Sequence, residues 1–191
     1  MRYDAVVLAG GRATRLGGTP KPTVEVGGTT LLDRALAATV GADRTAVVGP
    51  PGTAAGARDD VVITREDPPF GGPVAGIAAG LAALRRPGAP ALVLLLAVDV
   101  PRARAAADRL LASPPAGSDG VHLVRRGRDQ WLTGLYRRAA LEKALAALEP
   151  HGAPVRRLMA GLDLARIPDE TGVSDDVDTW DDVTRLSEEA P

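Results

Sequence analysis

Cysteine is missing from this sequence of 191 residues, and aromatic side chains make up only 3% of it. Without cysteine there is no disulfide, no thiolate nucleophile and no cysteine-ligated zinc. With so few aromatic rings, the stacking surfaces that bind single-stranded nucleic acids would be hard to build. The sequence therefore points away from disulfide scaffolds, thiol enzymes and single-strand binding proteins.

An excess of charge of one sign is also lacking, because 23 Lys plus Arg stand against 24 Asp plus Glu, for a net charge of -1. No overall field attracts nucleic acid or an anionic membrane, so we expect neither as a partner. Long apolar runs are absent too: none reaches the roughly 20 residues of a membrane span, and the N-terminal run is too short for a signal peptide. We therefore expect a cytoplasmic protein that captures any anion locally.

The length and the 45% hydrophobic content suit one continuous core, so we expect a single nucleotide-handling domain over residues 1–191. Short apolar segments without alternation predict parallel strands covered on both faces, at 5–8, 45–48, 61–64 and 91–98. Helical patterns lie between them at 31–40, entered through a capping box of Thr30 and Asp33, and at 77–84. This alternation predicts an α/β fold with three layers, α/β/α, and a mostly parallel Rossmann-like sheet.

The second half of the chain is less regular. It predicts a helix, two strands that would make a short antiparallel addition to the sheet, and a further helix, at 104–111, 120–124, 131–136 and 141–148. A last helix is expected to begin near Trp180, because Thr179 is a good N-cap and acidic residues follow it.

The segment after the first strand, residues 8–22, reads LAGGRATRLGGTPKP. Glycines let backbone N–H groups approach phosphate oxygens, while arginine and lysine supply the opposing charge. The spacing is that of neither a Rossmann fingerprint nor a Walker A loop, because Lys21 comes three residues after Gly18 and precedes Pro22. The loop therefore predicts a polyphosphate site of another class.

The pattern L-A-G-G-x-x-x-R-x-G-G-x-x-K resembles the signature loop of the GT-A-like nucleotidyltransferases and is most similar to that of the molybdenum cofactor guanylyltransferases. Residues 71–77, GGPVAGI, resemble the segment that closes over the nucleotide in that family. A Gly-Pro turn at a helix start also exposes N–H groups that suit an anion or a ribose oxygen, although a tight strand-to-helix turn would look the same. Just before it, Glu66 and Asp67 offer carboxylates for a base or ribose contact, and the resemblance does not choose between them.

The most apolar strand pattern, 92–98, ends in Asp99-Val100-Pro101. A carboxylate at the carboxyl end of a buried strand lies where ligands bind in open α/β sheets, although a turn or capping Asp is the plainer alternative. The sequence AVDVP resembles the C-D-x-P segment of the family, whose Asp holds Mg²⁺. The resemblance thus implies Mg²⁺ as cofactor and Asp99 as its ligand, and one or two protein carboxylates suffice for this ion.

Residues 174–179, SDDVDT, resemble the N-x-N-T/S segment of the family, but Asp176 and Asp178 replace both amides with carboxylates that only accept hydrogen bonds. In related sugar nucleotidyltransferases the second position also reaches the metal, which makes Asp178 a candidate second ligand. The added negative charge would repel the phosphate of a molybdopterin unless Mg²⁺ or an arginine compensates. A plain helix cap is the alternative.

Residues 134–138, GLYRR, follow GRDQW at 127–131 and resemble a strand of the guanylyltransferases. The two arginines, with Arg125 and Arg126, are candidates to line the acceptor pocket, and a solvated hairpin fits equally well. His122 and His151 have no partner at metal-ligand spacing, so we interpret both as structural. No Ser-His-Asp or Cys-His order indicates a covalent intermediate.

The resemblance implies Mg²⁺-dependent transfer of GMP from GTP to the phosphate of molybdopterin, release of pyrophosphate, and delivery of the product to a molybdoenzyme or its chaperone. Catalysis would fall to Arg15, Lys21 and Asp99. Nucleotide binding would involve Leu8, Ala9, Gly10, Gly11, Arg12, Lys21, Asp67, Gly72, Pro73, Gly76 and Asp99. The alternatives are a molybdopterin cytidylyltransferase, a sugar-1-phosphate or phospholactate nucleotidyltransferase, and a nucleotide-binding module that has lost catalysis. The sequence does not choose between GTP and CTP.

Overall fold

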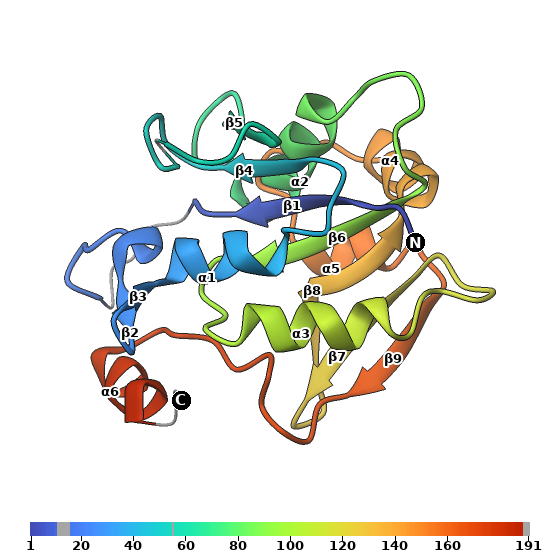
Figure 1. The fold of residues 1–191 in the computed structure, drawn as a ribbon. Helices are drawn as coiled ribbons and strands as arrows, with labels where there is room; N and C mark the ends of the chain where they lie inside the picture. The colour runs from blue at the N-terminus through green and yellow to red at the C-terminus, as the bar shows by residue number, and fades with distance from the viewer. Residues whose placement is uncertain (11–15, 55, 189–191) are drawn as a thin grey trace.

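A computed structural model describes residues 1–10, 16–54 and 56–188 of the chain (Figure 1). Its main sheet has seven strands in the order β5-β4-β1-β6-β8-β7-β9. In chain order these strands are β1 (Asp4–Leu8), β4 (Thr45–Val48), β5 (Val61–Thr64), β6 (Leu92–Ala97), β7 (Gly120–Arg125), β8 (Arg128–Arg137) and β9 (Leu164–Pro168). β8 runs antiparallel to both of its neighbours, and every other pair in this sheet is parallel. The predicted α/β class with a mostly parallel sheet is confirmed.

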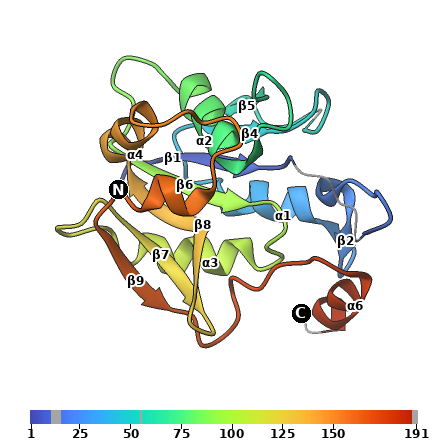
Figure 2. The same ribbon diagram turned by 180° about the vertical axis from the view of Figure 1, so that it is seen from behind.

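The helices form a layer on each face of this sheet (Figures 1 and 2). One face packs against α2 (Gly72–Ala83), α4 (Arg138–Ala146) and α5 (Val155–Met159). The other packs against α1 (Leu31–Ala38), α3 (Ala103–Leu111) and α6 (Trp180–Glu188). β1 contributes side chains to the core on both faces of the sheet. Val6 and Leu8 point to the first face and Val7 to the second, as the two-residue period of a strand requires. No helix in the described ranges is long and apolar enough to cross a membrane.

Smaller elements surround the end of β1. Residues Lys21–Thr23 form a 3-10 helix, and β2 (Glu25–Val26) pairs with β3 (Thr29–Thr30) as a two-stranded antiparallel ribbon. The ribbon leads directly into α1, where the predicted capping box is confirmed: the Asp33 N–H donates to Thr30 Oγ1 at 3.1 Å, and that hydroxyl donates to the Asp33 carboxylate at 2.6 Å. Likewise the Asp182 N–H donates to Thr179 Oγ1 at 3.2 Å at the start of α6.

α2 lies unusually close to β1 because glycines face the sheet. A Cβ at Gly80 would lie 2.6 Å from Val6 Cγ1, and one at Gly76 would lie 3.1 Å from Leu8 Cδ2. The helix also begins at Gly72, five residues before the predicted start at Ile77, since Pro73 is tolerated in a first turn, where no intrahelical N–H bond is lost. The close approach brings the N-terminus of α2 beside the carboxyl end of β1.

β8 carries an irregularity at its middle. His122 of β7 pairs with Gly134, but the next residue, Leu123, pairs with Gln130. Residues 131–133 therefore have no partner in β7 and form a bulge. Bulges commonly redirect side chains beside functional sites. This one lies next to the carboxyl end of β6, because Leu95 of β6 pairs with Gly134.

Candidate active site

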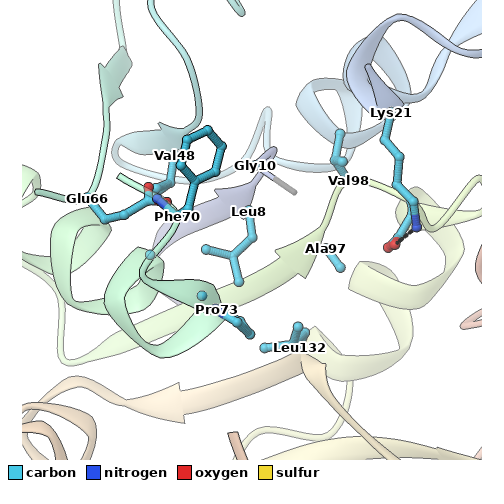
Figure 3. Close-up of a pocket in the computed structure, with 13 residues that line it drawn as sticks. Leu8, Gly10, Lys21, Val48, Glu66, Phe70, Pro73, Ala97, Val98 and Leu132 are labelled. Atoms are coloured by element: carbon cyan, nitrogen blue, oxygen red, sulfur yellow. Dashed lines mark hydrogen bonds and ion pairs between the residues drawn. The ribbon is translucent and has the colours of Figure 1, made fainter. Parts of the chain in front are cut away.

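The parallel strands β5, β4, β1 and β6 end at the same edge of the sheet, and a cavity of about 340 Å³ lies there (Figure 3). We call it the first cavity. Its volume falls within the range of small-molecule sites. The lining residues come from strand ends, the N-terminus of α2 and nearby loops: Leu8, Gly10, Lys21, Val48, Glu66, Phe70, Gly72, Pro73, Gly76, Ala97, Val98, Asp99 and Leu132.

Most of the residues assigned to the nucleotide lie in this lining, with two exceptions among those described. Ala9 is buried, and its N–H donates to the Val48 carbonyl at 2.8 Å, so this N–H is engaged within the sheet. Asp67 is exposed and does not line the cavity, whereas its neighbour Glu66 does. Three further predicted residues, Gly11, Arg12 and Arg15, lie outside the described residues.

The two ends of the first cavity differ in chemistry. In Figure 3 the side chains of Glu66 and Phe70 lie at one end and Lys21 lies at the other, with apolar groups such as Leu8 and Pro73 between them. The first turn of α2 also borders the cavity. Helix N-termini present N–H groups and a partial positive charge, which favour anionic or oxygen-rich ligands. An elongated ligand with an apolar face and an anionic end fits this arrangement.

Lys21 joins two carboxylates that are far apart in the sequence. Its Nζ lies 2.7 Å from Asp99 Oδ2 and 2.7 Å from Asp178 Oδ1. Burial lowers the pKa of Lys21, but the adjacent carboxylates of Asp99 and Asp178 outweigh burial, so the pKa lies above its ordinary value. The lysine is therefore held as an ammonium ion.

Asp178 reaches Asp99 because the segment before α6 is anchored internally. Asp169 is buried, and its carboxylate accepts hydrogen bonds from the N–H groups of Gly172, Val173 and Ser174 and from the Ser174 hydroxyl. Farther along, the fully buried side chain of Val177 packs in the core shared by β1 and α1. These contacts place the residues on either side of Val177 beside the end of β6.

Asp176 completes a cluster of three carboxylates. One oxygen each from Asp99, Asp176 and Asp178 lies within 4.8 Å of the others. Packing around Asp176 and the charge of Asp99 raise the pKa of Asp176 above its ordinary value, which shows that the negative charges oppose one another. Carboxylate oxygens are the ligands that Mg²⁺ and Mn²⁺ prefer, so this donor set fits such a cation. The sequence predicted Asp99 and Asp178 as ligands, and in the structure Asp176 lies beside both of them.

A second cavity of about 270 Å³ adjoins the first at Asp99. It shares Ala97, Asp99 and Leu132 with the first cavity. The remaining lining comes largely from the β8 bulge and the anchored segment: Val100, Asp129, Gln130, Trp131, Thr133, Val155, Ser174 and Asp176. Asp99 is therefore accessible from both cavities.

The four arginines that were candidates for an acceptor pocket line neither of the two cavities. Arg125 pairs with Asp175 at 2.7 Å, and the buried Arg138 pairs with Asp4. Arg137 donates to the carbonyls of Ser118 and Pro115, and the exposed Arg126 lies in the β7–β8 turn with a φ of 49°. The reason lies in strand direction: because β8 is antiparallel to β6, Arg137 pairs with Leu92 at the opposite edge of the sheet.

Several lining residues have no clear signal in the sequence. Val48 follows from the strand pattern alone, but the bulge that presents Trp131 and Leu132 depends on long-range register. Phe70 is 63% exposed at the cavity mouth, where the Arg65 guanidinium lies 5.3 Å from its ring centroid. The predicted structural role of His122 fits its position, since it is buried and its Nε2 lies 2.9 Å from Asp129 Oδ1.

Solved structures share this fold. A nucleotidyl transferase from Methanothermobacter is 21% identical, with 98% of this chain and 97% of that chain covered and a TM-score of 0.78. Rv0371c from Mycobacterium tuberculosis is 29% identical, with 98% of each chain covered and a TM-score of 0.74. A structure of Rv0371c in complex with manganese is 27% identical, with 100% of each chain covered and a TM-score of 0.69. Molybdopterin-guanine dinucleotide biosynthesis protein A from Archaeoglobus fulgidus is 21% identical, with 97% of each chain covered and a TM-score of 0.69.

No curated protein sequence is significantly matched by this chain. The family model of the MobA-like NTP transferase domain, by contrast, matches residues 5–167. That range contains β1, α2, β6 and the β8 bulge, and thus most of both cavities. The chain belongs to the MobA-like NTP transferase family and is a nucleotidyltransferase.

Proposed function

We propose that this chain transfers the GMP part of GTP to the phosphate of molybdopterin or the molybdenum cofactor and releases pyrophosphate. The observation that carries the proposal is the position of Asp99, which lines both cavities. A nucleotide in the first cavity and a phosphate-bearing acceptor in the second would meet at this carboxylate. Molybdopterin as the acceptor and GTP as the donor rest on the resemblance of residues 8–21, 71–77 and 134–138 to the guanylyltransferases.

The first cavity suggests how the nucleotide is oriented. The end with Phe70 and Glu66 suits the base and ribose, because it combines an apolar ring with a carboxylate that can accept from hydroxyl or amino groups. The end with Lys21 suits the phosphates. Gly10 and the first turn of α2 would contact the part of the nucleotide between the base and the phosphates. From the resemblance, Gly11, Arg12 and Arg15 join Lys21 at the phosphates.

Asp99 and Asp178, with Asp176, would hold the divalent cation that the proposal requires. Such a cation, Mg²⁺ in this proposal, neutralises charge on the phosphates when bound. Two observations support it: the donor set is entirely carboxylate, and Rv0371c was solved in complex with manganese. The ammonium of Lys21, 2.7 Å from Asp99, adds a fixed positive charge at the same place.

The proposed reaction is a direct displacement. An oxygen of the acceptor phosphate forms a bond to the α-phosphorus of GTP, the bond from that phosphorus to the bridging oxygen breaks, and pyrophosphate leaves with the electron pair. The acceptor phosphate is already an anion at neutral pH, so no general base is required. The residues contribute by positioning the two phosphates and by opposing their negative charge, which are the main sources of rate in phosphoryl and nucleotidyl transfer.

The decisive experiment measures pyrophosphate release from GTP and from CTP, each with molybdopterin and Mg²⁺. Release from GTP that requires both molybdopterin and metal supports the proposal, and an Asp99→Asn variant should abolish it. Preferential release from CTP would replace the guanylyl assignment with a cytidylyl one. A thermal-shift titration with each nucleotide and Mg²⁺ reports binding separately, because a ligand stabilises by RT ln(1 + [L]/Kd). Stabilisation without any pyrophosphate release would identify a binding module and overturn the proposal.

A further inference from the structure

The second cavity is acidic. Three carboxylates, those of Asp99, Asp129 and Asp176, belong to its lining, and no lysine, arginine or histidine does among the described residues. Asp99 and Asp176 belong to the carboxylate cluster that fits a cation. Asp129 does not belong to that cluster, so a metal ion there would leave its charge uncompensated by coordination. The lining therefore offers a carboxylate to whatever part of the acceptor extends beyond the phosphate.

Asp129 is held in a fixed orientation by partners on two neighbouring strands. Its Oδ1 lies 2.9 Å from His122 Nε2 on β7 and 2.9 Å from Arg166 Nε on β9. Hydrogen bonding to His122, outweighing partial burial and aided by the nearby charge of Arg166, lowers the pKa of Asp129, so this group stays ionised at neutral pH. The structure gives Oδ2 no hydrogen-bond partner among the described residues, and the side chain is 31% exposed at the cavity.

We propose that Asp129 selects the acceptor: its free Oδ2 accepts a hydrogen bond from an N–H or O–H group on the organic part of the acceptor. An acceptor that places a carboxylate there has no proton to donate to Oδ2 and is used less well. This inference rests on the proposed nucleotidyl transfer and specifies its acceptor class as a phosphomonoester whose organic part carries a hydrogen-bond donor.

The rest of the lining supports this acceptor class. Gln130, Thr133 and Ser174 supply neutral polar groups, and Trp131 supplies a flat apolar surface from the bulge. A carboxylate brought beside Asp129 Oδ2 has no proton to donate, so it would leave this oxygen without a hydrogen bond, whereas Oδ1 already has His122 and Arg166 as partners. A donor group would instead form a charge-assisted hydrogen bond, which is stronger than a neutral one.

A matched pair of small acceptors tests the need for a hydrogen-bond donor in the native protein. Propane-1,2-diol 2-phosphate and 2-phospholactate differ only where a hydroxymethyl group replaces a carboxylate. Each is assayed with GTP and Mg²⁺ by pyrophosphate release, beside molybdopterin as a larger donor-bearing acceptor. At least one donor-bearing acceptor should have a kcat/KM about tenfold or more above that of 2-phospholactate, since a hydrogen bond to a charged group is worth this much. Equal or better use of 2-phospholactate, or no release with either donor-bearing acceptor, overturns the inference.

The variant Asp129→Asn tests the residue. It should raise the KM for the donor-bearing acceptor roughly ten- to hundredfold and leave the KM for GTP unchanged. Asp59→Asn, at an exposed position before β5, is the matched control, and the GTP-induced thermal shift shows that each variant is folded. An unchanged acceptor KM in Asp129→Asn contradicts the inference.

The two proposals fail in different ways. If the protein uses molybdopterin and the KM for molybdopterin is the same in Asp129→Asn as in the native protein, the proposed function stands and the inference fails. If the protein uses the diol phosphate in a way that depends on Asp129 but does not use molybdopterin, the inference stands and the proposed acceptor is wrong.

Discussion

Val177 donates its backbone N–H to the carbonyl oxygen of Asp99 at 2.8 Å. This hydrogen bond attaches the segment before α6 to the end of β6, so the residues on either side of Val177 border the Asp99 side chain. The side chain of Val177 is buried in the core, whereas the carboxylates of Asp176 and Asp178 lie beside that of Asp99. The cluster of three carboxylates thus depends on a backbone pairing between a strand end and a segment near the C-terminus.

Lys21→Ala is expected to lower turnover on the order of 10²-fold or more, the usual cost of removing one preorganised charge-stabilising group. Pyrophosphate release measures this, and thermal unfolding should show that the fold persists. The matched control is Lys143→Ala, at an exposed position on α4. A Lys21→Ala enzyme with near-normal turnover would remove this lysine from the catalytic group.

Asp99→Asn is expected to abolish the metal-dependent activity, because an amide is a weaker ligand than a carboxylate for a hard divalent cation. A Mn²⁺ titration followed by calorimetry, without nucleotide, should also show weaker metal binding than in the native protein. Asp59→Asn serves as the control. An unchanged response to added metal and to its removal with a chelator would show that another residue is the main ligand.

Asp169→Asn is expected to reduce the free energy of unfolding by about 2–3 kcal/mol, because hydrogen bonds to a charged group are replaced by fewer, neutral ones. Although burial raises the pKa of Asp169, hydrogen bonds from Ser174 and its neighbours outweigh this effect, so the folded-state pKa is lowered. This contribution is therefore present above the unfolded-state pKa of about 4 and is lost as the pH falls through the folded-state pKa. Denaturant unfolding at pH 7 and near pH 3 should show the difference between the two proteins shrinking at the lower pH. A constant difference would contradict the assignment.

Gly80→Ala is expected to destabilise the protein by about 1–3 kcal/mol, even though alanine favours helices, because overpacking a close contact forces the neighbours apart. The added methyl would lie 2.6 Å from Val6 Cγ1 and 3.2 Å from Val48 Cγ2. Gly117→Ala is the control, since a Cβ there would meet nothing within 4 Å. Equal melting temperatures for the two variants would show that α2 can move away from the sheet at little cost.

The parts of the fold that local patterns determine were predictable. The parallel strands 45–48 and 61–64 match the predicted ranges, since continuous apolar runs between turns are their direct signature. Only 45–48 is buried as predicted, because 61–64 lies at the edge of the sheet and Ile63 is exposed. The β2–β3 ribbon was missed, although Gly27-Gly28 between two short strands is a hairpin signal, and both glycines have positive φ. β9 and α5 were missed because a five-residue edge strand and a five-residue helix depend on tertiary packing.

In the site, too, some residues follow from local sequence patterns and others depend on tertiary structure. The position of Asp99 at the carboxyl end of β6 was predictable from strand direction, and the resemblance of AVDVP to the C-D-x-P segment singled this residue out. The misplacement of Arg137 and Arg138 has the opposite cause, since the direction and register of β8 decide which edge they occupy. Asp129 carries no motif at all: its orientation comes from His122 and Arg166 on separate strands.

Leu132 borders both cavities, and this has a consequence for the product. In the proposed reaction, the molecule formed by joining a nucleotide to its acceptor would extend across this side chain, with one half in each cavity. Two linked halves bind more tightly than either alone when their geometry allows simultaneous contact. Release of the joined product, rather than bond formation, is therefore expected to limit the cycle, and a non-reactive mimic of that product is the natural lead for an inhibitor.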